Sequence, residues 1–566
     1  MINFVQIHLN NVKNCLHYVL FKMFFLPIFL YFIIFLIFTY PLIFQFSSHL
    51  FTEGGDGYVY IWNIWWINEA VTQFHQVPWN TTYLFFPYDT SLLNHDYLLL
   101  FGFLGIFFLK FLTLSEYYNL LVIFSFVGSG FTLFLLANYF SKSYIGSLIG
   151  GFIFAFSSYS FAHGVGHLSL ISLEFIPLFI LCWYIFLKKP SVKMGIISGI
   201  VLFTVILCDY YYFFYCFVIG LIMFIGFIIQ KKSIFIYLKK QYLLAFASFI
   251  IAVLLTSGYY VLSMLLLIKS DPSKDGGHLP QGFSLDLFSF IIPGAFWRFN
   301  NLTESYWSNL RGNIVESSVY LGFSILIILI YVWIKRKELF NGKIWYWWYF
   351  IIIFFAVMSI GPTLHIFGNE ITFITELPYA WLERIFPPIK LGGTPVRMMI
   401  IVTLGASVIC ALGFKHLFRK SVKTKIVGIL LLFILLIEYL PKKMPSIKVV
   451  IPEHFKYLKS LPGKSGVIDI SENKMTGDRF FLINMYYQTM HEKPIATGLI
   501  SRISKNVFDK KQEILRLIDR KDFYILHKDY NFRYIITDEK TDIKSKHPTI
   551  KEVYKDNKYK IYDMGK

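Results

Sequence analysis

The stretch GGDGYVYIWNIWW, residues 54–66, follows directly on a long apolar run and places one acidic residue, Asp56, among glycines. Three tryptophans and a glutamate then recur with the spacing of one helix face: Trp62, Trp65, Trp66 and Glu69. Tryptophan favours the membrane interface, where its ring is apolar and its N–H stays hydrated, so the pattern predicts an amphipathic helix over 58–71 lying along that interface. Asp56 either caps this helix or faces a substrate that the glycines allow to approach closely, and the local pattern favours neither.

The composition of the whole chain excludes a soluble globular protein. Of its 566 residues 56% are hydrophobic and only 15% are charged, and the mean hydropathy is +0.57. Too few charges are present to cover a soluble surface, and the apolar runs are long enough to cross ~30 Å of hydrocarbon. The sequence predicts a polytopic α-helical membrane protein with about eleven spans, near 23–46, 117–140, 144–162, 168–187, 193–209, 212–230, 241–268, 314–334, 345–360, 396–416 and 425–440.

Lysine and arginine fall in every second connection between these spans. Because cytoplasmic loops are rich in these residues, the alternation places the N-terminus in the cytoplasm. The opposite connections are then extracytoplasmic: 47–116, 163–167, a turn near Asp209, 269–313, 361–395 and everything after 440. The same bias accounts for the net charge of +19, so nucleic acid is not expected as a partner. A span at 98–114 would invert the alternation, and this segment is therefore predicted to be re-entrant or interfacial.

The sequence has neither a CxxC pair nor a signal-peptide cleavage site of the small-residue kind. The five cysteines show no CxxC pairing, so neither a disulfide framework nor a cysteine metal site is expected. The first apolar run lacks a small-residue cleavage site and is interpreted as a retained signal anchor.

The segment 441–566 has only short apolar stretches, unlike the transmembrane domain, residues 1–440. GVIDI (466–470) and YIITD (534–538) have the pattern of buried strands, and SRISKNVFDKKQEILRLI (501–518) that of a helix and its start. The sequence predicts a soluble α/β domain of ordinary size on the extracytoplasmic side.

Polar residues in the first two extracytoplasmic connections are candidates for a substrate cavity. His95 and Asp96 form a polar group just before an apolar run, where a solvated loop is an equally good interpretation. His163 and His167 are four apart, but the glycines between them argue against a rigid helix that would hold a metal, and a substrate-facing pair is favoured. Glu174 falls inside a predicted span, where a carboxylate is costly and is a functional candidate.

Two further candidates come from later connections. Glu316 stands at the predicted extracytoplasmic start of a span, and Arg397 follows the sequence LGGTP. A phosphate-bearing substrate favours the planar, bidentate guanidinium of an arginine, and Arg397 is the residue we expect in that role.

The order of these features resembles the GT-C superfamily of membrane glycosyltransferases: an N-terminal span, an outer loop opening with an acidic residue, then an aromatic helix. More narrowly, several short motifs look like a bacterial group of YfhO-type or related membrane proteins: GGDGYVYIWNIWW, FFPYDTSL, AFSSYSFAHGVGHLSL, GNIVESSVYLG, SIGPTLHIFG, GGTPVRM and MYYQTMHEKPIATGLISR. The resemblance runs over most of the chain, although each motif alone is weakly specific.

The resemblance implies transfer of a sugar from a polyprenyl-phosphate donor to an extracytoplasmic acceptor in the cell envelope, at the bacterial inner or plasma membrane. It implies that Asp56 is the catalytic base, since an acceptor hydroxyl needs a base within hydrogen-bond reach. Some members carry a D-x-D or E-x-D pair and a divalent metal, whereas Glu53 and Asp56 are three apart here. Dependence on a divalent metal is thus undecided, and catalysis without a metal is favoured. Arg397 or the histidines would then stabilise the charge on the phosphate.

Two other functions remain open at this point. A transporter or flippase of lipid-linked sugars would need its polar groups near the bilayer midplane and related halves, whereas here they gather on one face. A non-catalytic envelope-assembly factor would not depend on Asp56. The sugar is undefined, and the acceptor could be a glycolipid, a polymer, a polysaccharide or a protein.

Overall fold

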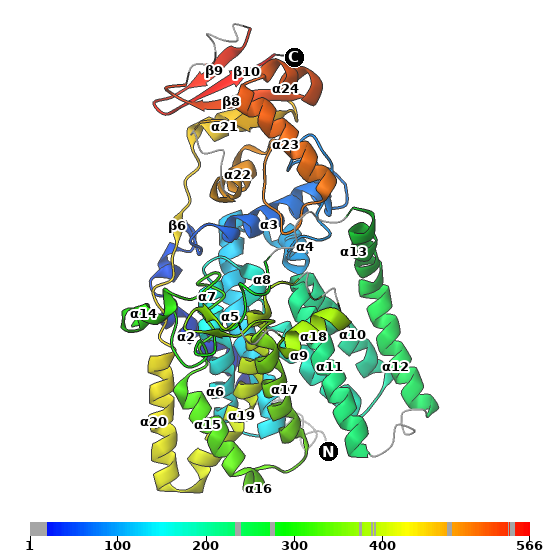
Figure 1. The fold of residues 1–566 in the computed structure, drawn as a ribbon, viewed down its shortest axis with the longest axis vertical. Coiled ribbons are helices and arrows are strands. Elements are labelled where there is room, and N and C mark those ends of the chain that lie inside the picture. Colours follow the sequence, from blue (N-terminus) through cyan, green and yellow to red (C-terminus); the bar gives the residue numbers. More distant parts are fainter. Residues whose placement is uncertain are drawn as a thin grey trace, which may run out of the picture.

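The computed structural model describes residues 20–231, 239–271, 278–372, 376–386, 389, 392–471, 478–541, 543 and 549–565. Long helices form a bundle, and the segment after Glu438 runs along it to a smaller domain stacked on one end (Figure 1). Within these residues six helical stretches are long and apolar enough to cross a membrane: Phe21–Thr39, Leu114–Ser141, Tyr144–His163, Tyr210–Gln230, Lys240–Ser270 and Pro395–Lys420. The chain is a multi-pass membrane protein, and the larger number of about eleven spans stays a prediction.

The bundle helices are α2 (Leu26–Thr39), α5 (Leu114–Ser141), α6 (Tyr144–Ala155), α7 (Ser158–His163), α9 (Phe175–Lys188), α10 (Val192–Cys208), α11 (Tyr210–Lys231), α12 (Lys240–Val253), α13 (Tyr259–Ser270), α15 (Phe323–Ile334), α17 (Ile344–Ser359), α19 (Met399–Lys420) and α20 (Val422–Glu438). The connections hold short elements: η1 (Phe21–Phe25), η2 (Leu42–Gln45), β1 (His49–Leu50), α3 (Asp56–Thr72), β2 (Asn80–Thr81), β3 (Thr90–Ser91), α4 (Leu99–Phe108), α8 (Leu168–Ile171), η4 (Leu254–Gly258), η5 (Asn300–Thr303), α14 (Glu304–Trp307), α16 (Arg336–Leu339), β4 (His365–Ile366), β5 (Asn369–Glu370), α18 (Pro378–Ile385), η7 (Pro395–Met398) and β6 (Ile447–Lys448).

Helix α19 is the buried centre of the bundle. It packs on α5, α6, α15, α17 and α20. Small residues allow the closest of these contacts: a Cβ on Gly146 of α6 would lie 2.2 Å from the backbone oxygen of Ala411, and one on Gly150 would lie 2.9 Å from that of Ser407. This is the close backbone packing that small residues spaced by four give membrane helices.

Two predicted spans are shorter than the sequence indicated. In the segment 168–187, α8 ends at Ile171 and α9 begins only at Phe175, so Glu174 precedes the helix rather than lying inside it. In the segment 314–334, the helix begins at Phe323, after a non-helical stretch that carries Glu316. The segment 98–114 contains only the ten-residue helix α4, about 15 Å long and too short to cross the hydrocarbon.

The C-terminal domain is built on a four-stranded sheet of order β7-β8-β10-β9. Strand β7 is parallel to β8, and the other neighbours are antiparallel. Its elements are α21 (Glu453–Ser460), β7 (Gly466–Asp469), α22 (Asp478–His491), α23 (Lys505–Arg520), α24 (Phe523–Tyr530), β8 (Phe532–Asp538), β9 (Lys551–Lys555) and β10 (Tyr559–Asp563). The two predicted strands and the predicted helix are confirmed as β7, β8 and α23, the last capped by Ser504.

Helix α3 confirms the predicted helix after Asp56, but the prediction that its tryptophans face the membrane interface is wrong. The helix lies between the bundle and the C-terminal domain and packs on α4 and α22 (Figure 1). Trp62, Trp65 and Trp66 are buried in a cluster with Met485, and Trp62 Nε1 donates a hydrogen bond to Gln488 Oε1 at 2.7 Å. The aromatic face therefore docks the two domains on each other.

Candidate active site

A cavity of about 650 Å³ lies where the bundle meets the C-terminal domain. Its walls come from the start of α3, the loop before α4, the loop before α8 and α8 itself, the junction of α10 and α11, the turn η7 before α19 and the segment before α23. Six of the eight predicted site residues line it: Asp56, His95, Asp96, His167, Glu316 and Arg397. The fold therefore brings residues that lie up to several hundred positions apart in the sequence together at one cavity.

Asp56 and His167 form a hydrogen-bonded pair in this cavity. Asp56 Oδ2 lies 2.8 Å from His167 Nε2, and the side chain of Asp56 is 46% exposed whereas that of His167 is 15% exposed. The carboxylate therefore faces the cavity and the imidazole stands behind it. The N-cap of α3 is Gly55, with no side-chain cap bond, so the alternative interpretation of Asp56 as the helix cap is wrong.

Glycines let the backbone bring this pair together. Gly55 has φ of +54°, in the left-handed region, where a side chain would be strained. A Cβ on Gly57 would lie 2.2 Å from Thr52 Oγ1. That hydroxyl donates to the backbone oxygen of Val165 at 2.8 Å, two residues before His167, so the loop leading into α3 is fastened to the histidine loop.

The charges around the pair favour its ionised form. Burial raises the pKa of Asp56, but the hydrogen bond and charge of His167, with the charges of Arg397 and His278, more than offset it and hold that pKa below its ordinary value. Burial lowers the pKa of His167, and the bond to Asp56 more than offsets it, so that pKa is raised. Asp56 is therefore a carboxylate at neutral pH and can accept a proton.

Glu316 and Arg397 form a second, buried pair beside the first. Arg397 Nε lies 3.1 and 3.0 Å from the two carboxylate oxygens of Glu316, and Nη2 lies 2.5 Å from Oε1. The guanidinium also stacks on Tyr211, 4.7 Å from the ring centroid. His163 lies behind this pair, its Nε2 3.7 Å from Glu316 Oε2, and it does not line the cavity. Much of the positive charge of Arg397 is thus neutralised by its carboxylate partner.

His95 ties the cavity wall to the C-terminal domain. Its Nδ1 accepts the backbone N–H of Ser501 at 3.1 Å, and its Nε2 lies 3.2 Å from Asn63 Oδ1. Burial lowers the pKa of His95 to about 3, so the ring is neutral, with its proton on Nε2. The backbone N–H of Asp96 donates to Ser501 Oγ at 3.1 Å, which adds a second tie to the same serine.

Asp96 belongs to a network of hydroxyls beside His95 in the cavity wall. Its Oδ2 accepts hydrogen bonds from Tyr60 at 2.5 Å and from Ser169 at 2.7 Å. Ser169 Oγ also lies 3.3 Å from Asp209 Oδ2, which brings a second carboxylate to the same hydroxyl. Burial raises the pKa of Asp96, against the lowering effect of the Tyr60 and Ser169 hydrogen bonds. This wall offers hydroxyl and carboxylate groups of the kind that bind sugar hydroxyls.

Glu174 lies apart from the cavity. It is buried at the start of α9, and neither carboxylate oxygen has a hydrogen-bond partner. A Cβ on Gly128 of α5 would lie 3.3 Å from Glu174 Cβ, which places the side chain between helices. Glu174 is therefore not part of the cavity that the other predicted site residues line.

The side chains present do not fit a divalent metal. Across the described parts of the chain, no group of three or more His, Cys, Asp and Glu side chains is arranged to hold one. At Asp56 the neighbouring donor is a single imidazole, already hydrogen-bonded to the carboxylate.

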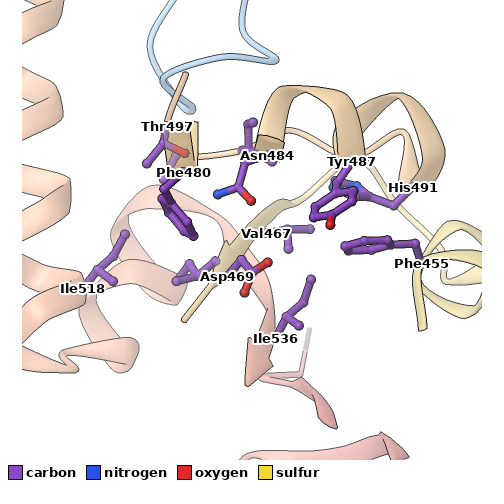
Figure 2. A pocket seen from close by; sticks show the side chains of 13 residues that line it. Phe455, Val467, Asp469, Phe480, Asn484, Tyr487, His491, Thr497, Ile518 and Ile536 are labelled. Atoms are coloured by element: carbon purple, nitrogen blue, oxygen red, sulfur yellow. The ribbon is translucent and has the colours of Figure 1, made fainter. Parts of the chain in front are cut away.

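A second hollow lies within the C-terminal domain, between α21, α22 and the sheet (Figure 2). Asp469, Asn484 and His491 point into it among apolar side chains. Its volume of about 20 Å³ has room for about one water molecule and none for a sugar.

Several residues that line the cavity are not predicted by the sequence patterns. Tyr60 lies four residues after Asp56, on the same helix face, and that spacing could have identified it. Ser501 and Arg502 end the motif MYYQTMHEKPIATGLISR, but nothing in the local pattern indicates that the C-terminal domain reaches this cavity. His278 likewise comes from a connection without a recognisable signal.

Several solved structures are similar in fold to this chain. The arabinofuranosyltransferase AftD from Mycobacteria matches with a TM-score of 0.54 and 11% identity, over 95% of this chain and 40% of AftD. ArnT from Cupriavidus metallidurans, bound to undecaprenyl phosphate, gives 0.47 and 10% over 95% and 97% of the two chains. The oligosaccharyltransferase AglB from Archaeoglobus fulgidus gives 0.42 and 11% over 92% and 70%.

The likeness to AftD confirms the GT-C fold predicted from the sequence, and at this identity it concerns the fold alone. The chain spans about 40% of the length of AftD. No curated protein matches the chain, and the narrower resemblance to YfhO-type proteins stays a prediction. A family model described as "Domain of unknown function (DUF6311)" matches residues 28–439, well over half of the chain. The protein therefore belongs to the DUF6311 family and has the fold of GT-C membrane glycosyltransferases.

Proposed function

We propose that the protein transfers a sugar from a polyprenyl-phosphate donor to an acceptor on the extracytoplasmic face of a bacterial plasma membrane, with Asp56 as the catalytic base. The observation that carries the proposal is the pair of Asp56 and His167: a half-exposed, ionised carboxylate that faces a cavity of about 650 Å³ and is held by an imidazole 2.8 Å behind it. In this proposal the N-terminus is cytoplasmic and the C-terminal domain extracytoplasmic.

The reaction is a single displacement at the anomeric carbon. Asp56 accepts the proton of the acceptor hydroxyl as its oxygen bonds to that carbon. The bond between the carbon and the phosphate oxygen breaks, and its electron pair leaves with the polyprenyl phosphate. One displacement inverts the anomeric configuration. Since the leaving group is already a phosphate, no strong protein acid is required.

The residues around Asp56 have supporting roles in this proposal. His167 orients the carboxylate, and its positive character favours the ionised form. Arg397, held by Glu316, adds positive potential where charge develops on the phosphate. His163 supports Glu316 from behind. His95, Asp96 and Glu316 shape the remaining walls for the sugar.

A lipid donor suits an apolar recess next to the cavity. This recess, about 220 Å³, is lined by the start of α11, by α18 and by the turn before α19, with Phe214, Tyr379 and Met398 among its residues. It shares Tyr210 and Tyr211 with the polar cavity. A donor whose chain enters the recess would place its head group near Asp56.

The GT-C fold adds support, because AftD is an arabinofuranosyltransferase of that fold. The sugar and the acceptor of this chain are not defined by this likeness. Transport of a lipid-linked sugar is less well supported, because a transporter needs its polar groups near the middle of the bundle. The start of α3 and residues 499–503 line the polar cavity, and α3 lies between the bundle and the C-terminal domain (Figure 1).

The test is a comparison of wild type and Asp56→Asn in cells that lack the gene. Envelope glycans and polyprenyl-linked sugars are analysed by mass spectrometry at equal protein levels. The proposal expects Asp56→Asn to lose one glycan modification and to accumulate its lipid-linked donor. Full restoration by Asp56→Asn would contradict catalysis by this residue and would favour an assembly factor or a transporter.

A further inference from the structure

Arg502 lies in the walls of three hollows. It lines the polar cavity with Asp56, the apolar recess formed by α11, α18 and the turn before α19, and a third hollow of about 190 Å³ that opens among Asp89, Asp271 and Ser504. Among the described residues it alone lines all three. A group bound by Arg502 would stand where an apolar chain ends and a polar head group begins.

Arg502 also has fewer partners than Arg397 among the described residues. Its Nε is buried without a hydrogen-bond partner, and the described part of the chain contains no ion pair to its guanidinium. Arg397, the other arginine of the cavity, is instead held by Glu316 through three close contacts. A buried guanidinium N–H without an acceptor is costly, so this site is suited to an anionic ligand.

The loop that carries Arg502 is fixed in place. Ser501, its neighbour, accepts the backbone N–H of Asp96 and donates its own backbone N–H to His95. The arginine is thus positioned by the wall of the cavity, although it belongs to the C-terminal domain.

Resting on the proposed function, we propose that Arg502 is the ligand of the donor's lipid phosphate and that the C-terminal domain thereby completes the donor site. The planar guanidinium offers parallel N–H donors that match two phosphate oxygens. Its charge also opposes the negative charge that grows on the phosphate as the sugar leaves. Arg397 then has the lesser part of holding Glu316 and raising the local potential.

The test measures binding of undecaprenyl phosphate to the full-length protein in nanodiscs. Undecaprenol, which lacks the phosphate, and inorganic phosphate, which lacks the lipid, are the comparison ligands. The variants are Arg502→Gln, Arg502→Lys and, as a matched control, Arg516→Gln, an exposed arginine of the same domain on α23. Thermal unfolding of each variant establishes that it is folded.

Loss of a charged hydrogen-bond donor is expected to weaken undecaprenyl phosphate binding about tenfold or more in Arg502→Gln. Arg502→Lys keeps the positive charge but loses the planar pair of N–H donors, so its affinity for undecaprenyl phosphate is expected to lie between those of wild type and Arg502→Gln. Arg516→Gln is expected to bind with the wild-type affinity. Undecaprenol binding is the same in all four proteins.

Three results would overturn the inference. If Arg502→Gln binds undecaprenyl phosphate within twofold of wild type, Arg502 is not the ligand, and the donor class stands. If only inorganic phosphate binding depends on Arg502, the site takes a free anion. If wild type does not distinguish undecaprenyl phosphate from undecaprenol, the donor class in the proposed function fails as well.

Discussion

Asp56 Oδ2 lies 2.8 Å from His167 Nε2, and this contact joins the first residue of α3 to a loop more than one hundred positions later in the chain. His167 Nδ1 is buried without a hydrogen-bond partner, whereas Asp56 is half-exposed. The carboxylate is thus the member of the pair that can meet a substrate, and the histidine sets its charge and orientation.

Replacement of His167 by glutamine is expected to move the acid limb of activity to higher pH. His167 holds the pKa of Asp56 below its ordinary value, so its loss lets burial raise that pKa. Activity that needs the carboxylate ionised is then lost at a higher pH as the solution is acidified. The measurement is kcat/KM against pH with the donor found in the Asp56→Asn cells. His278→Gln removes the smallest of the named contributions that lower this pKa and should shift the limb less. An unmoved limb in His167→Gln would contradict the role of His167.

Removal of Glu316 is expected to destabilise the fold. Glu316→Gln leaves the guanidinium of Arg397 buried without its carboxylate, at a cost of about 3–5 kcal/mol. Thermal unfolding in detergent should show a large drop for Glu316→Gln and partial recovery in Glu316→Leu/Arg397→Met. The matched control is Glu370→Gln, which breaks an exposed pair with Arg311 and should cost about 1 kcal/mol or less. Equal effects of the two single variants would argue against a special role for the buried pair.

His95→Asn is expected to loosen the C-terminal domain from the cavity. Asparagine is too short to bond both Asn63 and Ser501, so at least one hydrogen bond of about 1 kcal/mol is lost. Limited proteolysis within residues 492–504 should then proceed about fivefold faster or more. His75→Asn, at an exposed site after α3, provides the control. Cleavage at the wild-type rate in His95→Asn would show that other contacts carry the docking.

Gly57→Ala is expected to reduce activity without contact to any substrate. The new Cβ would lie 2.2 Å from Thr52 Oγ1, so the threonine must move and its bond to Val165 is strained or lost. We expect a destabilisation of about 1–3 kcal/mol and a fall in activity, as in other overpacked sites. Gly342→Ala, with no atom within 4 Å of its Cβ, should behave as wild type in both assays. Wild-type activity of Gly57→Ala would show that the glycine does not position Asp56.

Local patterns predicted much of the fold. Apolar runs identified the helices of the bundle, short apolar stretches identified β7 and β8, and the pattern of a helix and its start identified α23. Candidate site residues chosen because they were polar at the ends of apolar runs proved to line one cavity in six of eight cases. Such residues gather because a polar group at the end of a membrane helix must face protein or water.

The rest depended on partners distant in sequence. The same tryptophan spacing is compatible with a lipid interface or a protein interface. The tryptophans face protein because α3 packs on α22, which comes about four hundred residues later in the chain. The ion pair between Arg397 and Glu316, which are 81 positions apart, likewise has no signal in the local sequence. Because of this pair, Arg502 rather than Arg397 is the cavity arginine without an ion-pair partner among the described residues. The reach of Ser501 and Arg502 into the cavity follows from the docking of a whole domain.

The most direct test of the central claim is a single-turnover assay in reconstituted vesicles with the donor identified in cells. Release of polyprenyl phosphate is followed for wild type and Asp56→Asn, and donor binding is measured in the same preparations. Asp56→Asn is predicted to bind the donor with the wild-type Kd and to release polyprenyl phosphate at least about a hundredfold more slowly, the usual size of a general-base contribution. Release at the wild-type rate in Asp56→Asn would contradict the assignment of Asp56 as the base.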